Sequence, residues 1–301
     1  MNEVFPYVSI VIPIIGYRNI PSYLCKTLST LEYPKNRLEV LLVKLTSQNI
    51  QFSLLEREVK FVNSQETIGY SKAANLGIQK GRGELIFLIN PDIRLNSKVL
   101  QNLVDYFTSN SLVAVVGPVV FQLTIHKKIS PYDLPGINFN KHFGKMTFMT
   151  EKQISKIKNP HEVDWLSGCA LLFPRKVWFT LGGFEEKLFI YWEDADFCMR
   201  AKEKGLKVVL VPQARVWHKG SEYMRSQNFS KTYYLKRNGI YFLERHSGLL
   251  GKIILHMHNL LIFLIKLIRF VFQARKRRET HVFLRGVIDF YQGKWGKFYE
   301  R

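Results

Sequence analysis

The chain has 301 residues, a length that fits one large domain with an appendage or two small domains. Hydrophobic residues make up 47% of it, enough to bury a full-sized core, so the composition excludes an intrinsically disordered chain. The net charge of +20, from 44 basic and 24 acidic residues, predicts a polyanionic neighbour: nucleic acid, anionic lipid or a phosphorylated substrate.

The three cysteines, Cys25, Cys169 and Cys198, are odd in number and far apart. They form no CxxC pair that would indicate zinc and no spacing typical of a disulfide framework. We therefore expect reduced thiols in the core of a cytoplasmic protein. The chain enters an apolar run at Val8 without a preceding basic region or cleavage site, so no signal peptide is predicted.

Short apolar runs alternate with helical patterns in the first ninety residues. Strands are expected at 8–12, 39–43, 60–63 and 85–89, and helices at 21–31 and 71–79. This alternation predicts an α/β fold with a mixed, mostly parallel sheet flanked by helices on both faces. Ligands of such sheets bind beyond the carboxyl ends of the strands, where Asn90-Pro91-Asp92 follows a buried strand.

The second half begins with a less regular stretch. Residues 122–160 contain several Pro and Gly residues and are expected to form loops over the site. Ordered structure is predicted to return at 163–173, with helices at 174–181 and 191–204 and a strand at 207–211.

The last segment, residues 246–301, differs in composition. It carries 11 Lys/Arg and 3 Asp/Glu, a net charge of +8. Its apolar stretch, 249–272, has only 13 residues free of charge between Lys252 and Lys266, short of the ~20 that span a bilayer. Polar side chains recur there at helical spacing and form one narrow stripe opposite a wide apolar face. This pattern predicts a C-terminal helical extension lying on an anionic membrane surface, or a helix packed on the domain or on a second subunit.

Two acidic motifs are candidates for chemistry. Asp92 in Asn90-Pro91-Asp92 follows a strand and can hold a divalent cation, although this tripeptide also marks turns. Trp192-Glu193-Asp194-Ala195-Asp196 places three acidic residues at a helix start. Asp196 can pair with Arg200 four residues on, whereas Glu193 and Asp194 have no such partner. They are either a solvated first turn or a carboxylate base in a pocket.

Together these motifs resemble family 2 of the nucleotide-sugar glycosyltransferases, with the GT-A fold, and especially its rhamnosyltransferase-like branch. The resemblance covers about residues 6–245, which would form the catalytic domain. It is carried by Val8–Pro13, Gly69–Gly77, Leu88–Asp92, Trp165–Gly168, Gly182–Glu186, Tyr191–Asp196 and Trp217-His218.

The resemblance implies a role for each matching position. Asp92 stands in the family's DXD motif as a ligand of Mg²⁺ or Mn²⁺, with His218 assisting the metal and the diphosphate, although a lone His is usually structural. Asp194 matches the catalytic base, with Glu193 beside it. The donor-binding positions would be Pro13, Lys44, Gly69, Asn75 and Asn90. Acceptor or sugar contacts would come from Trp165, Gly168 and Trp192, and the two tryptophans could equally be core aromatics.

Two departures bear on the donor. Lys44 stands where the family usually has an Asp that contacts the nucleotide, and Ile14-Ile15-Gly16-Tyr17 replaces a common polar turn. Lys44 would reach a phosphate instead, or the nucleotide would be held by backbone and other loops.

The function implied is inverting transfer of a sugar, rhamnose among the candidates, from a nucleotide-diphosphate donor to a hydroxyl of a cell-surface polysaccharide or lipid-linked glycan. The protein would act in the cytoplasm, peripherally bound to the inner face of the membrane. The alternative is a non-catalytic sugar-nucleotide or glycan-binding protein on the same fold. Nucleic acid is not expected as a partner, because no recognition motif for it appears; a homo-oligomer is compatible with the C-terminal segment.

Overall fold

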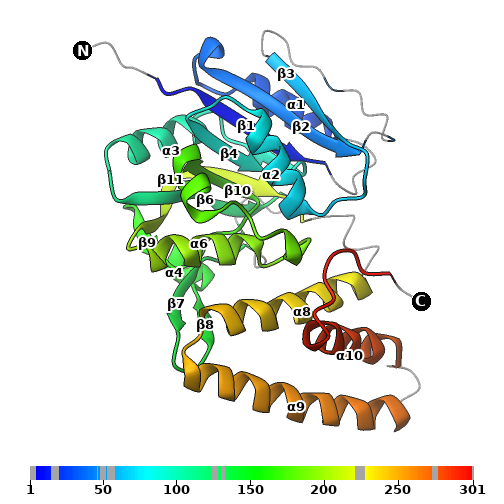
Figure 1. The fold of residues 1–301 in the computed structure, drawn as a ribbon. Helices are drawn as coiled ribbons and strands as arrows, with labels where there is room; N and C mark the ends of the chain where they lie inside the picture. Colours follow the sequence, from blue (N-terminus) through cyan, green and yellow to red (C-terminus); the bar gives the residue numbers. More distant parts are fainter. Residues whose placement is uncertain are drawn as a thin grey trace.

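The computed structural model in Figure 1 describes residues 5–14, 20–45, 47, 52, 58–123, 128–129, 133–220, 228–272 and 277–299. An α/β body forms the upper part of the view, and the helices of the C-terminal part lie beneath it. The predicted α/β class and the C-terminal helical extension are therefore confirmed.

A mixed sheet runs through the body in the order β3-β2-β1-β4-β10-β6-β11-β5, with β9 pairing with β11. The strands are β1 (Val8–Pro13), β2 (Leu38–Leu45), β3 (Glu58–Ser64), β4 (Leu85–Ile89), β5 (Ile93–Leu95), β6 (Val113–Gln122), β9 (His161–Val163), β10 (Ala170–Pro174) and β11 (Lys207–His218). The neighbours β3, β2, β1 and β4 are parallel, as are β6 and β11. Among the described strands of this sheet, only β10, β5 and β9 run against their neighbours, so the sheet is mostly parallel, as predicted.

Helices cover both faces of this sheet because its strands are apolar on both sides. Val8, Ile10 and Ile12 of β1 join the core beneath one set of helices, and Val11 joins the core beneath the other. The first set is α1 (Ser22–Ser29) and α3 (Val99–Thr108); the second is α2 (Tyr70–Lys80), α5 (Arg175–Leu181) and α6 (Glu193–Glu203). Cys169 and Cys198 are buried and Cys25 is partly exposed, and all three are free thiols.

The expected loop region, 122–160, is more regular than predicted. It contains a hairpin of β7 (Gly136–Asn140) and β8 (Lys145–Phe148), followed by a short helix, α4 (Glu151–Ile154). The hairpin pairs apart from the main sheet and its second strand is largely exposed, so it lacks a strong apolar pattern. The helix begins with a capping box between Thr150 and Gln153, a local signal that could have predicted it.

Strand β11 also extends beyond the predicted end at Val211. Pairing with β6 resumes at Arg215 after a register shift that includes Pro212, which has no N–H to donate. The irregularity hides the second half of the strand from a pattern search, and this half carries His218 to the edge of the sheet.

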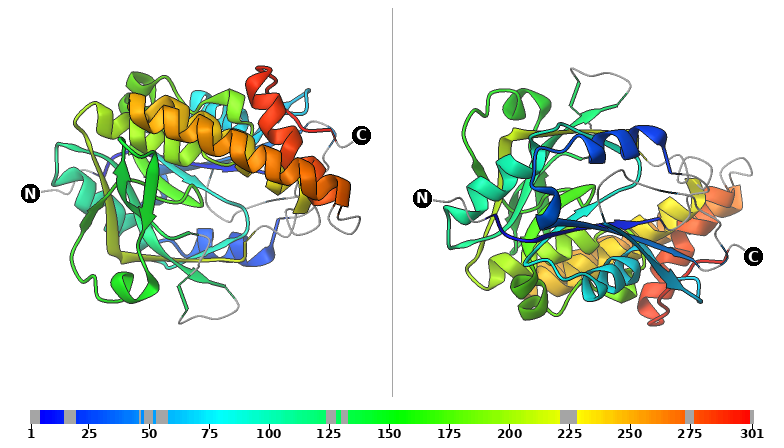
Figure 2. Two further views of the ribbon diagram at one scale, coloured as in Figure 1. Left: turned by 90° about the horizontal axis from the view of Figure 1, so that it is seen from below. Right: turned by 90° about the horizontal axis from the view of Figure 1, so that it is seen from above.

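Three helices make up the C-terminal part: α8 (Asn228–His246), which was not predicted, and α9 (Leu249–Phe272) and α10 (Arg277–Tyr291), which form the predicted extension. They pack on each other through Ile240, Leu255 and Val287. Helix α8 also contacts the body, because Phe242 joins Ala195 and Met199 of α6 in a small core. Viewed from below, α9 runs as one long helix across the molecule (Figure 2). A domain boundary at residue 245 stays a prediction.

Candidate active site

The parallel strands bring their carboxyl ends to one edge of the sheet. Pro13 ends β1, Lys44 lies near the end of β2, Asn90 follows β4 and His218 ends β11. These four predicted positions therefore share the edge at which α/β sheets bind ligands.

Asp92 and His218 face each other at this edge. His218 Nε2 lies 3.3 Å from Asp92 Oδ1 and 3.4 Å from Asn90 Nδ2. The Lys219 N–H donates to the Asp92 carbonyl at 3.1 Å, which ties the end of β11 to the Asn90-Pro91-Asp92 turn. Asp92 is 2% exposed, and within the described part of the chain neither carboxylate oxygen accepts a hydrogen bond. A buried carboxylate left in this way has the chemistry of a cation ligand.

Asp133 is a third member of this cluster that sequence reasoning missed. Its Oδ2 lies 2.9 Å from His218 Nδ1, and its Oδ1 accepts a hydrogen bond from Ser167 at 2.5 Å. Asp133, His218 and the Cys169 thiol offer ligand atoms within 4.8 Å of one another. Burial raises the pKa of Cys169 well above its usual range, so the thiol is a poor ligand beside two carboxylates, which hard cations prefer.

His218 is held between these carboxylates in a protonated form. Burial disfavours the charged imidazole, but Asp133 and then Asp92 outweigh it and raise the pKa of His218 to about 10. One positive charge thus stands between two buried acids.

The Ser167-Gly168-Cys169 bend links the acidic motifs. The Gly168 N–H donates to Asp194 Oδ2 at 2.7 Å. The carbonyl of the next residue, Cys169, accepts a hydrogen bond from the Asn90 N–H at 2.9 Å. A Cβ at Gly168 would lie 3.1 Å from Asp194 Cβ, closer than ordinary van der Waals contact, so a side chain here would press on the candidate base. The resemblance placed Gly168 among the sugar contacts; in the structure it contacts the candidate base.

Asp194 and Glu193 begin α6 in a poorly solvated place. Burial raises the pKa of Asp194, although the N–H groups of Gly168 and Ala195, at 2.7 and 2.8 Å, partly offset this. Glu193 is 6% exposed, and burial together with the Asp194 charge raises its pKa well above the usual range. Its Oε2 accepts no hydrogen bond within the described chain. A solvated first turn would not have these properties, whereas a carboxylate base would.

The backbone before α6 is strained. Phe189, Tyr191 and Trp192 have φ of 65°, 69° and 73°, in the left-handed region that costs a non-glycine residue about 1–3 kcal/mol. Asn238 of α8 holds this segment: its Nδ2 lies 2.7, 2.8 and 3.0 Å from the carbonyls of Leu188, Ile190 and Tyr191. Such strain persists only where surrounding contacts enforce it, and here it leads directly into Glu193 and Asp194. No sequence pattern indicated it.

Trp165 and Trp192 stack near the start of α6. Their ring centroids are 6.4 Å apart with an interplanar angle of 14°, and both side chains are half-buried. Phe148 of the hairpin packs against Trp165, and Phe242 of α8 against Trp192. The pair is therefore part of a small core and is also half-exposed, so both interpretations of these residues fit the structure.

The other predicted donor positions differ in what they contact. Lys44 Nζ lies 5.9 Å from the centre of the Phe61 ring. A Cβ at Gly69 would lie 2.2 Å from the Phe189 carbonyl, so this glycine permits the close approach of α2 to the strained segment. The amide of Asn75 is engaged by Trp178, Phe184 and Glu186, and it holds α2 to the turn before α6. Donor contacts by these residues stay predictions.

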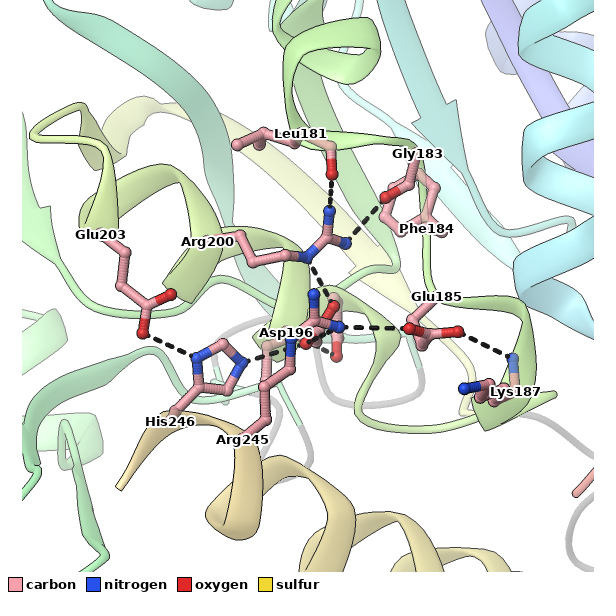
Figure 3. Close-up of polar contacts among 12 residues, drawn as sticks. Leu181, Gly183, Phe184, Glu185, Lys187, Asp196, Arg200, Glu203, Arg245 and His246 are labelled. Atoms are coloured by element: carbon pink, nitrogen blue, oxygen red, sulfur yellow. Dashed lines mark hydrogen bonds and ion pairs between the residues drawn. The ribbon is translucent and has the colours of Figure 1, made fainter. Parts of the chain in front are cut away.

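Asp196, the third acid of the motif, is structural (Figure 3). Its carboxylate lies 2.8 Å from Arg200 Nε, which confirms the expected pairing, 3.0 Å from His246 Nε2 and 3.2 Å from Arg245. Burial opposes ionisation, but His246 and the two arginines outweigh it and lower the pKa of Asp196. His246 also contacts Glu203, so the last residue of α8 is tied to both ends of α6.

Comparisons with known proteins agree with this geometry. The chain is 25% identical over 212 residues to N-acetylglucosaminyl-diphospho-decaprenol L-rhamnosyltransferase of Mycobacterium tuberculosis. The matched region covers 63% of this chain and 68% of the relative. It is 26% identical over 155 residues to a dTDP-rhamnosyl transferase of Shigella flexneri, covering 50% of this chain and 48% of that one.

Comparison with solved structures identifies the fold. A mannosyltransferase from Pyrobaculum calidifontis, determined with GDP-Man and Mn²⁺, superposes with a TM-score of 0.56 at 14% identity, over 97% of this chain and 89% of that one. This likeness identifies the GT-A fold. The family model described as Glycosyltransferase like family 2 matches residues 25–237, and the chain therefore belongs to glycosyltransferase family 2.

Proposed function

We propose that the chain is an inverting, metal-dependent glycosyltransferase. It would move a sugar, rhamnose being the first candidate, from a nucleotide-diphosphate donor to a hydroxyl of a growing cell-surface polysaccharide or lipid-linked glycan. One observation carries the proposal: consecutive residues, Gly168 and Cys169, hold Asp194 and Asn90, so a candidate base and a candidate cation site are joined by one bend. The activities for which the two rhamnosyltransferase relatives are named support the choice of sugar.

The cation would be Mg²⁺ or Mn²⁺, held by Asp92 and, once its binding has displaced the imidazole proton, by His218, with Asp133 behind the imidazole. The buried Asp92 carboxylate beside the His218 imidazole, with Asp133 on the other side of the ring, fits such an ion. A divalent cation bound there would neutralise charge on the leaving diphosphate, an effect worth several kcal/mol.

Asp194 would act as the base. Its carboxylate would accept the proton of the acceptor hydroxyl as the acceptor oxygen bonds to the anomeric carbon of the donor. The bond from that carbon to the diphosphate breaks in the same displacement, which inverts the configuration. A raised pKa makes Asp194 a stronger base than an exposed aspartate, and the raised pKa of Glu193 favours the neutral form of that neighbour.

The substrate contacts are assigned from the positions of the residues at the carboxyl edge of the sheet. Pro13, Lys44 and Asn90 would lie along the donor, with Gly69 and Asn75 shaping the helix beside it. The partly open Trp165–Trp192 stack would receive the acceptor or the transferred sugar, since aromatic faces pack on sugar rings.

The place of action would be the cytoplasm, at the inner face of the cell membrane. The acceptor named for the Mycobacterium relative is linked to a decaprenol lipid, which supports an acceptor anchored in a bilayer. Such an acceptor and an anionic surface account for the basic charge without nucleic acid.

The test is release of nucleoside diphosphate by the purified chain. A panel of nucleotide sugars is incubated with Mn²⁺ or Mg²⁺, with and without extracted lipid-linked acceptor. An enzyme releases diphosphate with one donor and more of it when acceptor is present. Saturable donor binding without release would instead favour the non-catalytic binding protein.

A further inference from the structure

Helix α9 presents its faces in the opposite sense to a helix that covers the core of a soluble protein, which buries its apolar face. The first half of the polar stripe predicted from its sequence faces the protein; Arg269 and Gln273 of that stripe lie outside the described side chains. Lys252 and His256 lie 3.5 and 2.9 Å from Glu244 of α8, and Asn259 accepts a hydrogen bond from Lys236 at 2.7 Å. The polar side chains of α9 thus hold it to α8.

The apolar side chains of α9 consequently face outward. Eleven large hydrophobic residues on this one helix are between 37% and 78% exposed: Leu249, Leu250, Ile253, Ile254, Met257, Leu260, Leu261, Leu264, Ile265, Leu267 and Ile268. Among the described side chains of α9, His258 is the one polar group in the exposed class. A 24-residue helix is about 36 Å long, so this surface is far more extensive than the scattered exposed residues of a soluble protein.

Basic residues stand at both ends of this apolar surface. At its start, the Gly248 N–H donates to the carbonyl of Lys141 in the turn of the β7–β8 hairpin. The Lys141 side chain is 52% exposed and its Nζ lies 3.7 Å from Glu203, and Phe143 of the same turn is 58% exposed. At the far end, α10 begins with the exposed Arg277 and Arg278. The surface is therefore complementary to a layer that is apolar inside and anionic outside.

We propose that the outer face of α9 docks flat on an anionic membrane surface. A second copy of this chain fits less well, because two chains of charge +20 would bring basic ends together. By length and composition alone, Leu249–Ile268 is long and apolar enough to cross a membrane. Its polar stripe is bound to Lys236 and Glu244 of α8, however, and crossing would break these contacts or draw charged groups into the bilayer. Docking goes beyond the proposed transfer reaction and does not depend on it.

The experiment is flotation of the full chain with vesicles, without donor or acceptor. Vesicles of phosphatidylcholine alone are compared with vesicles that contain phosphatidylglycerol. The test variant is Leu260→Glu/Leu264→Glu, one turn apart on the outer face, and Leu260→Gln/Leu264→Gln removes the apolar surface without adding charge. The matched control, Leu112→Glu/Phe179→Glu, changes two residues that are 60% and 64% exposed on the α/β body.

We expect the wild type and the control to float with the anionic vesicles, and the bound fraction of both α9 variants to fall at least tenfold. Melting temperatures close to that of the wild type would show that these variants are folded. Wild-type chain that stays unbound, or α9 variants that bind as the control does, would overturn the proposal. A dimer in solution that the same substitutions dissociate, without flotation, would replace it with self-association. Resistance of the bound chain to an alkaline carbonate wash would replace it with a spanning helix.

Discussion

The Asp92 turn and the start of α6 lie at the same edge of the sheet, yet they hold their carboxylates in opposite ways. Each oxygen of Asp194 accepts a backbone N–H, from Gly168 and Ala195. Neither oxygen of Asp92 accepts a hydrogen bond within the described chain, and its near neighbour is the imidazole of His218. The backbone of the protein thus fixes the orientation of the Asp194 carboxylate, whereas the Asp92 carboxylate receives no such hydrogen bond from the described chain. On the proposed function, this difference would separate a group that reacts from a group that binds.

The largest effect is expected at Asp194. Asp194→Asn keeps the side-chain shape and an oxygen that can accept from Gly168, but it removes the base, so transfer should fall about 10²–10⁴-fold. Donor affinity, measured by calorimetry, should persist. The control is Asp105→Asn, an exposed acid on α3. Wild-type turnover in Asp194→Asn would remove this residue from its assigned role.

Removing the cation site should cost somewhat less. Loss of several kcal/mol of charge stabilisation corresponds to about 10²-fold or more in rate, both for Asp92→Asn and for wild type treated with a chelator. Titration with Mn²⁺ should show weaker binding to Asp92→Asn than to Asp105→Asn. If a fully metal-stripped preparation kept its activity, Asp92 and His218 would not be metal ligands of this reaction.

A smaller effect should follow from releasing the strained segment. Asn238→Ala removes the amide that holds three carbonyls between Leu188 and Tyr191, so the backbone before Asp194 can relax. We expect kcat to fall about tenfold with the donor KM little changed, and a loss of stability of about 1–3 kcal/mol. The control, Leu235→Ala, changes a partly exposed side chain of the same helix and keeps the carbonyl that Trp192 contacts.

A purely structural role for Asn238 would lower the melting temperature of Asn238→Ala and leave kcat per folded molecule unchanged. That result would show that Asp194 is oriented by Gly168 and Ala195 alone.

The sequence predicts the positions of the two acidic motifs, but it does not predict some of the residues that surround and orient them. The run Leu85–Ile89 is apolar throughout, which predicts both a buried strand and the placement of Asp92 at its end. Asp133 lies in an irregular stretch and meets His218 across 85 positions of sequence, so no local pattern reveals it. The strain at Phe189–Trp192 was equally hidden, because non-glycine residues carry it and a distant Asn238 enforces it.

Helix α9 also shows a limit of sequence-based prediction, here for a whole helix face. Its spacing predicts a polar stripe and an apolar face correctly, and it cannot tell which of the two meets the protein. That choice depends on Glu244 and Lys236 of α8, a helix whose own pattern is weak enough that it was not predicted.

The last prediction sets Asp196 against Asp194, two positions away on the same helix. The pKa of Asp196 is lower in the folded chain than in the unfolded one, because His246, Arg200 and Arg245 outweigh its burial. Its contribution to stability is therefore complete above the unfolded pKa, about 3.9, and is lost as pH falls through the lower folded value. The free energy of unfolding in urea should fall as pH drops below about 4 in the wild type, and less steeply in Asp196→Asn. At neutral pH this variant should be about 3–5 kcal/mol less stable, because it leaves Arg200 buried without its partner. An identical acid slope in both proteins would mean that other carboxylates, and not Asp196, couple the C-terminal helices to α6 through their charge.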